Sequence, residues 1–488
     1  MAFLGLDIGT SAVKAVLVDE AEAVLAEAEV PLATQRPGPG LSEQDPAQWW
    51  LAVEAVLDRW RHVDPSLIAR VRGIGLSGQM HGAVCLGADE TPLRPAILWN
   101  DSRAEAEAAA LNRDHPELPA RLGVPCAPGF TAPKLPWLAR HEPTVFARIR
   151  WILNPKDFVR LTLTGEAVSD MSDAAGTWWL DQAARDWSDA ALAATGLDRS
   201  HMPRLVEGVT PAGMLRAVHA RRWGFGEGVV VAGGAGDAIA GAVGIGSVER
   251  GAFLSLGTSA QLFAPGTAYR PLPERFLHAF CHCAPGLWFQ MGAMLNGAST
   301  LAFLASVLGQ PIETLLEEVA AQPARPSPVV FLPYLTGERT PHNDAGATGV
   351  FSGLTPSTVR GDLTRAVLEG VAFAAADCAD CLAAAGTVLT ETALIGGGAR
   401  SALWAQIIAD VLGLPITRYV GGEKGPAFGA ARLARAAVTG EDIRRFALPP
   451  PTLDVAMPRP ALTDAYRERL AAFRALYRGT RAAREGRV

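Results

Sequence analysis

An acidic residue stands beside a turn of small residues close to the start of the chain. Asp7 ends one apolar run, Gly9, Thr10 and Ser11 form the turn, and a second apolar run follows. Such turns expose backbone N–H groups and hydroxyls that suit a phosphate chain, and a neighbouring carboxylate suits the magnesium ion that accompanies it. The pattern predicts a β-hairpin. Taken alone, it also fits a surface hairpin with a capping acid.

The same turn recurs about half a chain later. Residues 252–264 are AFLSLGTSAQLFA, against FLGLDIGTSAVKA at residues 3–15, with Ser255 in the place of the first acid. An internal repeat predicts two halves of similar architecture. Gly257 and Thr258 would then offer a second phosphate-binding turn to a shared cleft, with metal on the side of the first turn only.

A second acid, Asp237, stands among glycines in VVVAGGAGDAIAGAVGIG at residues 229–246. The run predicts a buried strand, a glycine turn and a small-residue helix that starts at the acid. Capping that helix would be a sufficient structural role for Asp237. The glycines, however, let another molecule approach the backbone, and a carboxylate at that point could accept a proton from a substrate hydroxyl.

Two polar stretches in the first half could contact a ligand. Gln79, Met80 and His81 lie between expected strands at 71–76 and 83–86, and Trp99, Asn100 and Asp101 precede an expected helix. Polar loops between strands often carry binding residues, and an aromatic, an amide and an acid together can line a polyol site. The alternatives are a histidine satisfied within the fold and an Asp101 or Ser102 that caps the helix.

A glycine turn recurs late in the chain, in LIGGGARS at residues 394–401. It predicts a strand, a turn through Gly397 and Gly398, and a helix capped by Ser401. Such a turn suits the base or ribose of a nucleotide, although a bare helix start fits equally well. Residues 331–344 should form a long polar loop. Helices are expected at 48–60 after the Asp45-Pro46 start, at 362–382, at 423–431 and near the C-terminus.

The overall composition limits the classes of protein. A chain of 488 residues predicts two domains, divided here at 1–246 and 247–488. The net charge of −6 gives no reason to expect a nucleic-acid partner. No signal peptide or membrane span is evident, and the cysteines look like core residues, so we expect a reducing cytoplasm. No P-loop is present, and the G-x-G-x-x-G at 73–78 runs between strands, which argues against a dinucleotide site.

Taken together, the two Gly-Thr-Ser hairpins, the glycine-flanked Asp237 and the late glycine turn resemble the FGGY family of sugar kinases. GFTAPKLPWLARH and the stretch from GVFSGL to DLTRAVLE resemble family signatures, and SGQMHG, WNDSR and YLTGERTPHN are most similar to the xylulokinase branch. The resemblance implies an α/β fold of two ribonuclease H-like domains of the actin and hexokinase type, with an interdomain cleft. It also implies ATP-dependent phosphorylation of D-xylulose to D-xylulose 5-phosphate, with ATP and Mg²⁺ as cofactors.

The resemblance also assigns roles to individual residues. Asp237 would be the general base, and Asp7 would hold magnesium through water. The sugar would contact Met80, His81, Trp99, Asn100 and Asp101, and ATP would contact Gly9, Thr10, Ser11, Lys14, Gly257, Thr258, Gly397, Gly398 and Ser401. The chain departs from the family at Ala238, where Asn is usual, which leaves the exact sugar open.

Several alternatives to this function remain. The chain could be a kinase for another pentulose or a pentitol. From a different class, it could be an actin- or chaperone-type ATPase without a sugar substrate. The partners we expect are a small-molecule sugar and ATP, with no nucleic acid and no membrane. A homodimer is left open.

Overall fold

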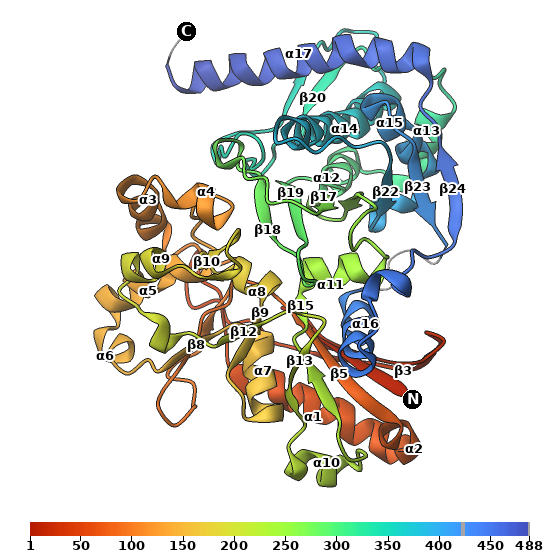
Figure 1. Ribbon diagram of the computed structural model, residues 1–488. Helices are drawn as coiled ribbons and strands as arrows, with labels where there is room; N and C mark the ends of the chain where they lie inside the picture. The colour runs from red at the N-terminus through yellow and green to blue at the C-terminus, as the bar shows by residue number, and fades with distance from the viewer. Residues whose placement is uncertain (421–424, 487–488) are drawn as a thin grey trace.

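The computed structural model describes residues 1–420 and 425–486 and consists of two α/β halves, one above the other in Figure 1. Each half is built on a seven-stranded mixed sheet. The first sheet runs in the order β13 (Pro211–Met214), β14 (Val230–Ala232), β5 (Val71–Gly78), β1 (Ala2–Ile8), β2 (Ala12–Asp19) and β3 (Val24–Pro31), with β15 (Ala235–Gly236) paired to β5. The second runs in the order β18 (His278–Cys281), β19 (Trp288–Met294), β17 (Ala260–Gly266), β16 (Phe253–Leu256), β22 (Thr392–Ile395), β23 (Ile416–Tyr419) and β24 (Thr452–Ala456).

The two sheets share one topology. In the first, β1 pairs with β2 antiparallel and with β5 parallel, and β5 pairs with β14 parallel. In the second, β16 pairs with β17 antiparallel and with β22 parallel, and β22 pairs with β23 parallel. Each Gly-Thr-Ser turn joins the antiparallel pair at the centre of its sheet. The two hairpins and the two similar halves predicted from the internal repeat are therefore confirmed.

Helices cover both sheets, and short strand pairs complete the lobes. The main helices are α1 (Pro46–Val63), α5 (Thr131–His141), α7 (Pro155–Thr164), α11 (Asp237–Gly244), α12 (Ser299–Leu308), α13 (Ile312–Ala320), α14 (Arg360–Ala384), α15 (Ala402–Leu412), α16 (Gly425–Thr439) and α17 (Pro460–Arg484). The remaining α-helices are α2 (Pro65–Ala69), α3 (Glu105–Asp114), α4 (Leu118–Leu122), α6 (Pro143–Phe146), α8 (Met171–Ala175), α9 (Asp189–Ala194) and α10 (Ala217–Trp223). The pairs are β4 (Glu43–Gln44) with β7 (Ala96–Ile97), β6 (Val84–Leu86) with β8 (Trp151–Leu153), β9 (Val168–Asp170) with β12 (Arg204–Val206), β10 (Leu180–Asp181) with β11 (Asp186–Trp187), and β20 (Val330–Leu332) with β21 (Val350–Ser352).

Helix α16 comes from the end of the chain but packs on the sheet of the first half, against β1 and β5 (Figure 1). Glycines make this contact possible. A Cβ on Gly5 would overlap with the carbonyl oxygen of Ala427, and one on Gly75 with that of Ala430. Gly73 faces Ala434 in the same way. The glycines of the G-x-G-x-x-G pattern therefore lie inside a strand, and two of them admit a helix rather than a dinucleotide.

A second close contact joins α16 to α11, the helix that begins at Asp237. A Cβ on Gly429 of α16 would overlap with the carbonyl oxygen of Ala240, and one on Gly244 would lie 3.0 Å from the oxygen of Gly425. The two helices lie between the sheets in Figure 1. Small residues bring their backbones together, so the position of α11 is set by α16.

The ends of the helices test the predicted caps. Asp45 caps α1, and its side chain accepts a hydrogen bond from Ala47 N, as predicted. The proposed capping by Asp101 or Ser102 is wrong, because α3 begins at Glu105 with Ala104 as its cap.

The expected loop 331–344 begins inside strand β20 and is irregular from Pro333 onward. The helix expected at 423–431 falls partly outside the described residues and is observed from Gly425.

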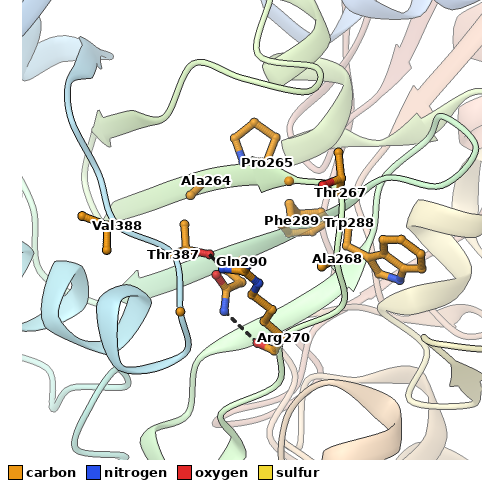
Figure 2. Close-up of a pocket in the computed structure, with 12 residues that line it drawn as sticks. Ala264, Pro265, Thr267, Ala268, Arg270, Trp288, Phe289, Gln290, Thr387 and Val388 are labelled. Carbon is orange, nitrogen blue, oxygen red and sulfur yellow. Dashed lines mark hydrogen bonds between the residues drawn. The ribbon is translucent and has the colours of Figure 1, made fainter.

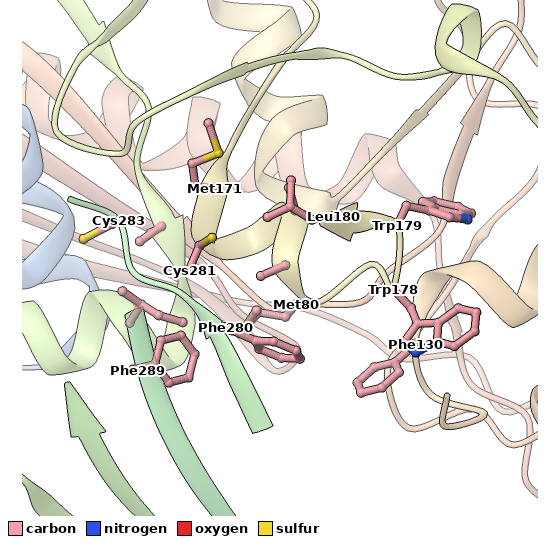
Figure 3. Packing of buried hydrophobic residues seen from close by; sticks show 14 of the residues in the cluster. Met80, Phe130, Met171, Trp178, Trp179, Leu180, Phe280, Cys281, Cys283 and Phe289 are labelled. Atoms are coloured by element: carbon pink, nitrogen blue, oxygen red, sulfur yellow. The ribbon is translucent and has the colours of Figure 1, made fainter. Parts of the chain in front are cut away.

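One hydrophobic cluster contains residues from both halves. Met80 and Phe130 of the first half belong to it together with Phe280 and Phe289 of the second (Figure 3).

All six cysteines are free and buried, as expected of core residues. Among the described residues, no single helix is long and apolar enough to cross a membrane, although the bent pair α12 and α13 passes by length and composition alone.

The contact between α16 and the first sheet should depend on the missing side chain at Gly75. We expect Gly75→Ala to lower the free energy of unfolding by about 1–3 kcal/mol or more, because overpacking against a backbone oxygen forces the helix away. Urea unfolding would measure this loss. Gly266→Ala is the matched control, since a Cβ on that strand glycine meets nothing within 4 Å. Equal stability of the two variants would contradict the close approach.

Candidate active site

The first Gly-Thr-Ser turn offers unused backbone donors. Gly9 N donates to Ala12 O at 3.0 Å, but the N–H groups of Thr10 and Ser11 have no acceptor among the described residues. Two adjacent free N–H groups in a turn form a concave site for an anion. These free donors are of the kind that a phosphate oxygen needs, and contact of Gly9, Thr10 and Ser11 with ATP stays a prediction.

A buried amide network fixes this turn. The Thr10 hydroxyl donates to Gln79 Oε1 at 2.9 Å and accepts from Trp99 Nε1 at 3.0 Å. Gln79 Nε2 donates to Gln44 Oε1 at 2.8 Å, and Gln44 Nε2 donates to Thr10 O at 2.7 Å. Gln44 was missed by the sequence reasoning, because nothing local shows that a residue beside a helix cap reaches a turn so far away in the chain. Trp99 ties its loop to the same turn and is 42% exposed.

Asp7 lies at the end of β1, beside this turn. Its Oδ1 accepts from the Ser77 hydroxyl at 3.0 Å, and Oδ2 has no hydrogen-bond partner among the described residues. Burial and the nearby Asp237 raise the pKa of Asp7 to about 7, against the hydrogen bond from Ser77 and the charge of Lys14. An oxygen of this kind fits a hard cation such as magnesium, whose charge would relieve the repulsion between the two acids. Lys14 lies directly opposite Asp7 on β2 and is exposed.

Asp237 is the first residue of α11, and the cap is Gly236. The alternative that Asp237 caps the helix is therefore wrong, because Gly236 holds the cap position; the Asp237 side chain accepts from Ala238 N at 2.7 Å. Burial raises the pKa of Asp237 to about 6, although hydrogen bonds from the backbone of Ala238 and of Asp237 itself oppose the rise. The carboxylate thus keeps a free oxygen and a pKa near neutrality, which are the properties of a general base.

Met80 packs beside Asp237, and His81 follows Met80 in the chain. A Cβ on Gly236 would lie 2.6 Å from Met80 Sδ, so the methionine packs directly against the residue before the acid. His81 has a positive φ of 68°, and its Nδ1 lies 2.6 Å from Gly176 O. A carbonyl only accepts, so Nδ1 carries the proton and Nε2 is left as an acceptor. Burial lowers the pKa of His81 to about 3, which keeps the ring neutral.

Helix α8 supports both His81 and Asp237. Gly176 at its end accepts from His81, and the hydroxyl of Ser172 accepts from Gly236 N at 3.3 Å. Beneath the helix, buried Lys156 Nζ contacts three carboxylates: Asp157 at 2.6 Å, Asp170 at 2.7 Å and Asp173 at 3.0 Å. The sequence reasoning missed this cluster. No local pattern connects Lys156 with Asp170 and Asp173, so the sequence carried no signal that these side chains meet.

The Trp99–Asp101 loop contributes one free acceptor. Asn100 Oδ1 is buried without a partner among the described residues, as expected of an atom that meets a hydroxylated ligand. Asp101 is already engaged, because it accepts from Ser42 N at 2.6 Å and from the Arg103 guanidinium. Burial raises the pKa of Asp101, but these hydrogen bonds outweigh it and hold the pKa below its usual value. Direct contact of Asp101 with sugar stays a prediction.

The second half presents the corresponding turn. Gly257 N donates to Ser259 O at 3.0 Å, while the N–H groups of Thr258 and Ser259 have no acceptor in the described part of the chain. The late glycine turn lies against β16, the strand that leads into this turn, since a Cβ on Gly398 would overlap with the side chain of Leu256 at the end of that strand. Ser401 caps α15 as predicted, accepting from Trp404 N at 3.2 Å. The contact of Gly397, Gly398 and Ser401 with adenosine stays a prediction.

A hollow of about 310 Å³ elsewhere in the second half has no part in this constellation (Figure 2). It is lined by residues at the ends of β17 and β19 and by the loop after α14. In it, Gln290 Nε2 donates to Arg270 O at 2.7 Å. None of the predicted site residues lines it, and it contains no carboxylate.

Comparisons with known proteins agree with this arrangement. Models of the FGGY family of carbohydrate kinases match residues 2–244 with the N-terminal domain and residues 252–438 with the C-terminal domain. The xylulose kinase of Escherichia coli (strain K12) is 46% identical over 480 residues, which cover 97% of this chain and 98% of that protein.

Solved structures agree as well. A crystal structure described as a xyloylose kinase from Brucella ovis superposes with a TM-score of 0.97 at 50% identity, covering 99% of this chain and 100% of that chain. The crystal structure of the xylulose kinase from Rhodospirillum rubrum superposes with a TM-score of 0.91 at 32% identity, covering 98% of this chain and 99% of that chain.

The buried cluster under α8 should be sensitive to loss of its lysine. We expect Lys156→Met to lower the free energy of unfolding by about 3–5 kcal/mol, because it leaves buried carboxylates without their cation. Chemical denaturation would measure the loss. The control is Arg467→Met, which removes an exposed ion pair with Asp464 and should cost about 1 kcal/mol at most. A Lys156→Met variant as stable as the control would show that the cluster contributes little.

Proposed function

The chain belongs to the FGGY family of carbohydrate kinases, and on that premise we propose that it transfers the γ-phosphoryl group of ATP to D-xylulose, giving D-xylulose 5-phosphate. The near full-length identity of 46% to a xylulose kinase supports this choice of sugar. A different pentulose or a pentitol is the alternative substrate. An actin- or chaperone-type ATPase has no use for a raised-pKa carboxylate beside a polar loop, so that class is disfavoured.

The nucleotide would be held between the two halves, which we propose to divide at 246/247. The free N–H groups of Thr10 and Ser11 would bind phosphate oxygens from one side, and those of Thr258 and Ser259 from the other. Asp7 would hold magnesium through water, and Lys14 would lie near the phosphates. Magnesium, when bound, supplies neutralisation of the phosphate charge. Gly397, Gly398 and Ser401 would face the adenosine.

The single observation that carries the proposal is the state of Asp237. Its carboxylate does not cap α11, keeps one oxygen free, and has a pKa of about 6 through burial. Such a group accepts the proton of a sugar hydroxyl as that oxygen attacks phosphorus. Phosphoryl transfer otherwise requires alignment and charge stabilisation rather than covalent help from the protein.

The sugar would be oriented by the neighbouring groups. His81 offers Nε2 as an acceptor for a hydroxyl, and Asn100 offers its free Oδ1. Met80 fills the space between His81 and Gly236, so it limits the size of the sugar at that point. Ala238 provides no amide side chain, and its backbone N–H is used by Asp237. Other residues must therefore contribute to the choice of sugar.

The substitution Asp237→Asn tests the base directly. It keeps the shape and the hydrogen bond from Ala238 N but removes the proton acceptor. We expect near-normal thermal stability, retained binding of ATP and sugar, and a loss of about 10²–10⁴ in kcat. A coupled assay of ADP release with D-xylulose would measure the rate.

Asp189 provides the matched control, because it is also the first residue of a helix, α9. Asp189→Asn should leave the rate unchanged. In the parent, kcat/KM should fall as the pH drops below about 6, because a protonated Asp237 no longer accepts a proton. If Asp237→Asn phosphorylates sugar within a few-fold of the parent, the assignment of the base is wrong.

Asp7→Asn tests the metal site. We expect the magnesium concentration for half-maximal activity to rise while the affinity for D-xylulose stays the same, because the amide is a poorer ligand for hard cations. Magnesium titration at fixed ATP, and calorimetric binding of ATP with and without magnesium, would measure this. Asp19→Asn, at the far end of the same hairpin, is the control. An unchanged magnesium requirement would remove Asp7 from the metal site.

A further inference from the structure

Arg339, in the loop after β20, is a half-buried cation without a partner. Its guanidinium makes no ion pair or hydrogen bond among residues 1–420 and 425–486. The adjacent Glu338 is buried, and its Oε1 accepts from Leu295 N at 2.7 Å and from Arg339 N at 2.8 Å. Its Oε2 has no hydrogen-bond partner among the described residues, and burial lowers the pKa of Arg339 although the charge of Glu338 opposes this. Leaving a cation partly desolvated and unpaired is costly, which points to a ligand that supplies the missing acceptors.

The loop of Arg339 lies beside His278, because the Thr340 hydroxyl donates to Phe276 O and the ring of Phe276 is 5.9 Å from that of His278. The ring of His81 is 4.8 Å from that of Phe130, which is 6.2 Å from that of His278 on β18. His278 is only 4% exposed, and its Nδ1 is buried without a partner in the described part of the chain. Burial and the charge of Arg339 both lower the pKa of the two histidines to about 3. His278 of the second half therefore packs, through Phe130, against His81 of the proposed sugar site in the first half.

The loop that carries Arg339 is fixed on both sides. Thr340 N donates to Ala293 O at 3.0 Å, and the Thr340 hydroxyl donates to Phe276 O at 2.8 Å. Further along, His342 stacks on Tyr477 of α17 with ring centroids 3.8 Å apart, and the Tyr477 hydroxyl donates to Asp344 Oδ2 at 3.0 Å. A backbone held in this way fixes the position from which the Arg339 side chain extends, which lowers the cost of ordering a binding site.

The order of contacts indicates which part of the sugar these groups meet. Asp237 follows Gly236, which packs on Met80, and Met80 is followed by His81. His81 contacts Phe130, and Phe130 contacts His278. His278 is therefore at the far end of this series from the proposed base. A sugar whose terminal hydroxyl meets Asp237 would direct its other end toward His278 and Arg339.

We propose that Arg339 and His278 complete the sugar site and bind the carbonyl end of the ketose, remote from the hydroxyl that is phosphorylated. The guanidinium donates to the carbonyl oxygen and a neighbouring hydroxyl, and His278 Nδ1 pairs with a hydroxyl at the same end. These contacts supply the discrimination that the alanine at position 238 does not. The inference rests on the proposed function.

The experiment compares Arg339→Met with the parent in two assays. The first measures KM for D-xylulose and for ATP separately. The second measures binding of D-xylulose and of xylitol, which lacks the carbonyl, by calorimetry. We expect the KM for D-xylulose to rise about tenfold to a hundredfold, because a hydrogen bond to a charged group is lost, while the KM for ATP stays the same. The preference for D-xylulose over xylitol should shrink in parallel.

Arg275→Met is the matched control, because Arg275 is another arginine of the second half without an ion pair among the described residues, and it lines a hollow beside α17 instead. It should leave both constants unchanged. Arg339→Lys keeps the charge and should recover part of the affinity, and His278→Leu should raise only the KM for the sugar. Thermal melting of each variant checks that it is folded. If Arg339→Met does not fold, the KM values of Arg339→Lys and His278→Leu test the inference instead.

Equal changes in both KM values, or an unchanged preference for D-xylulose over xylitol, would overturn the inference. Failure of the proposed function looks different, because the parent itself would then phosphorylate no pentulose. In that case calorimetric binding of the sugars to parent and Arg339→Met still reports whether this arginine contacts a ketose.

Discussion

The structure depends on the close packing of α16 against the first sheet and against α11. Three glycines remove the side chains that would otherwise keep these backbones apart: Gly5 and Gly75 in the sheet and Gly429 in the helix. The packing ties the last third of the chain to its first strands. Because α11 begins at Asp237, it also fixes the acid next to the end of β1, where Asp7 lies close enough to be affected by its charge.

Burial of titratable groups gives this site its chemistry. The pKa values of Asp7 and Asp237 are raised by burial, and the pKa of His81 is lowered by it. If the structure beneath these groups loosened, water would reach them and their pKa values would return toward the usual ones. Buried Lys156 prevents this by holding the acids around α8, whose end receives the hydrogen bond from His81. Burial thus sets the pKa values within the site, and the ion pairs of Lys156 fix the helix that supports it.

The sequence predicted what is local and repeated, and it missed what is distant. The hairpins, the duplicated topology and the caps at Asp45 and Ser401 follow from turn chemistry and short spacing, and all are observed. The amide network through Gln44, the acids around Lys156 and the packing of α16 join residues far apart in the chain, which no pattern of spacing reveals. The capping role considered as an alternative for Asp237 is wrong for a smaller reason, because the helix is capped one residue earlier, by Gly236.

The arginines of the C-terminal helix α17 form ion pairs that become visible only in the folded structure. In the sequence its arginines form an isolated basic stretch without a partner. In the fold, Arg474 pairs with Asp377 at 2.7 Å and Arg484 with Asp344 at 2.5 Å, while Tyr477 stacks on His342. The last two contacts secure the loop that carries Arg339. The helix therefore secures, from a distance, the loop of Arg339, the residue that we propose contacts the sugar.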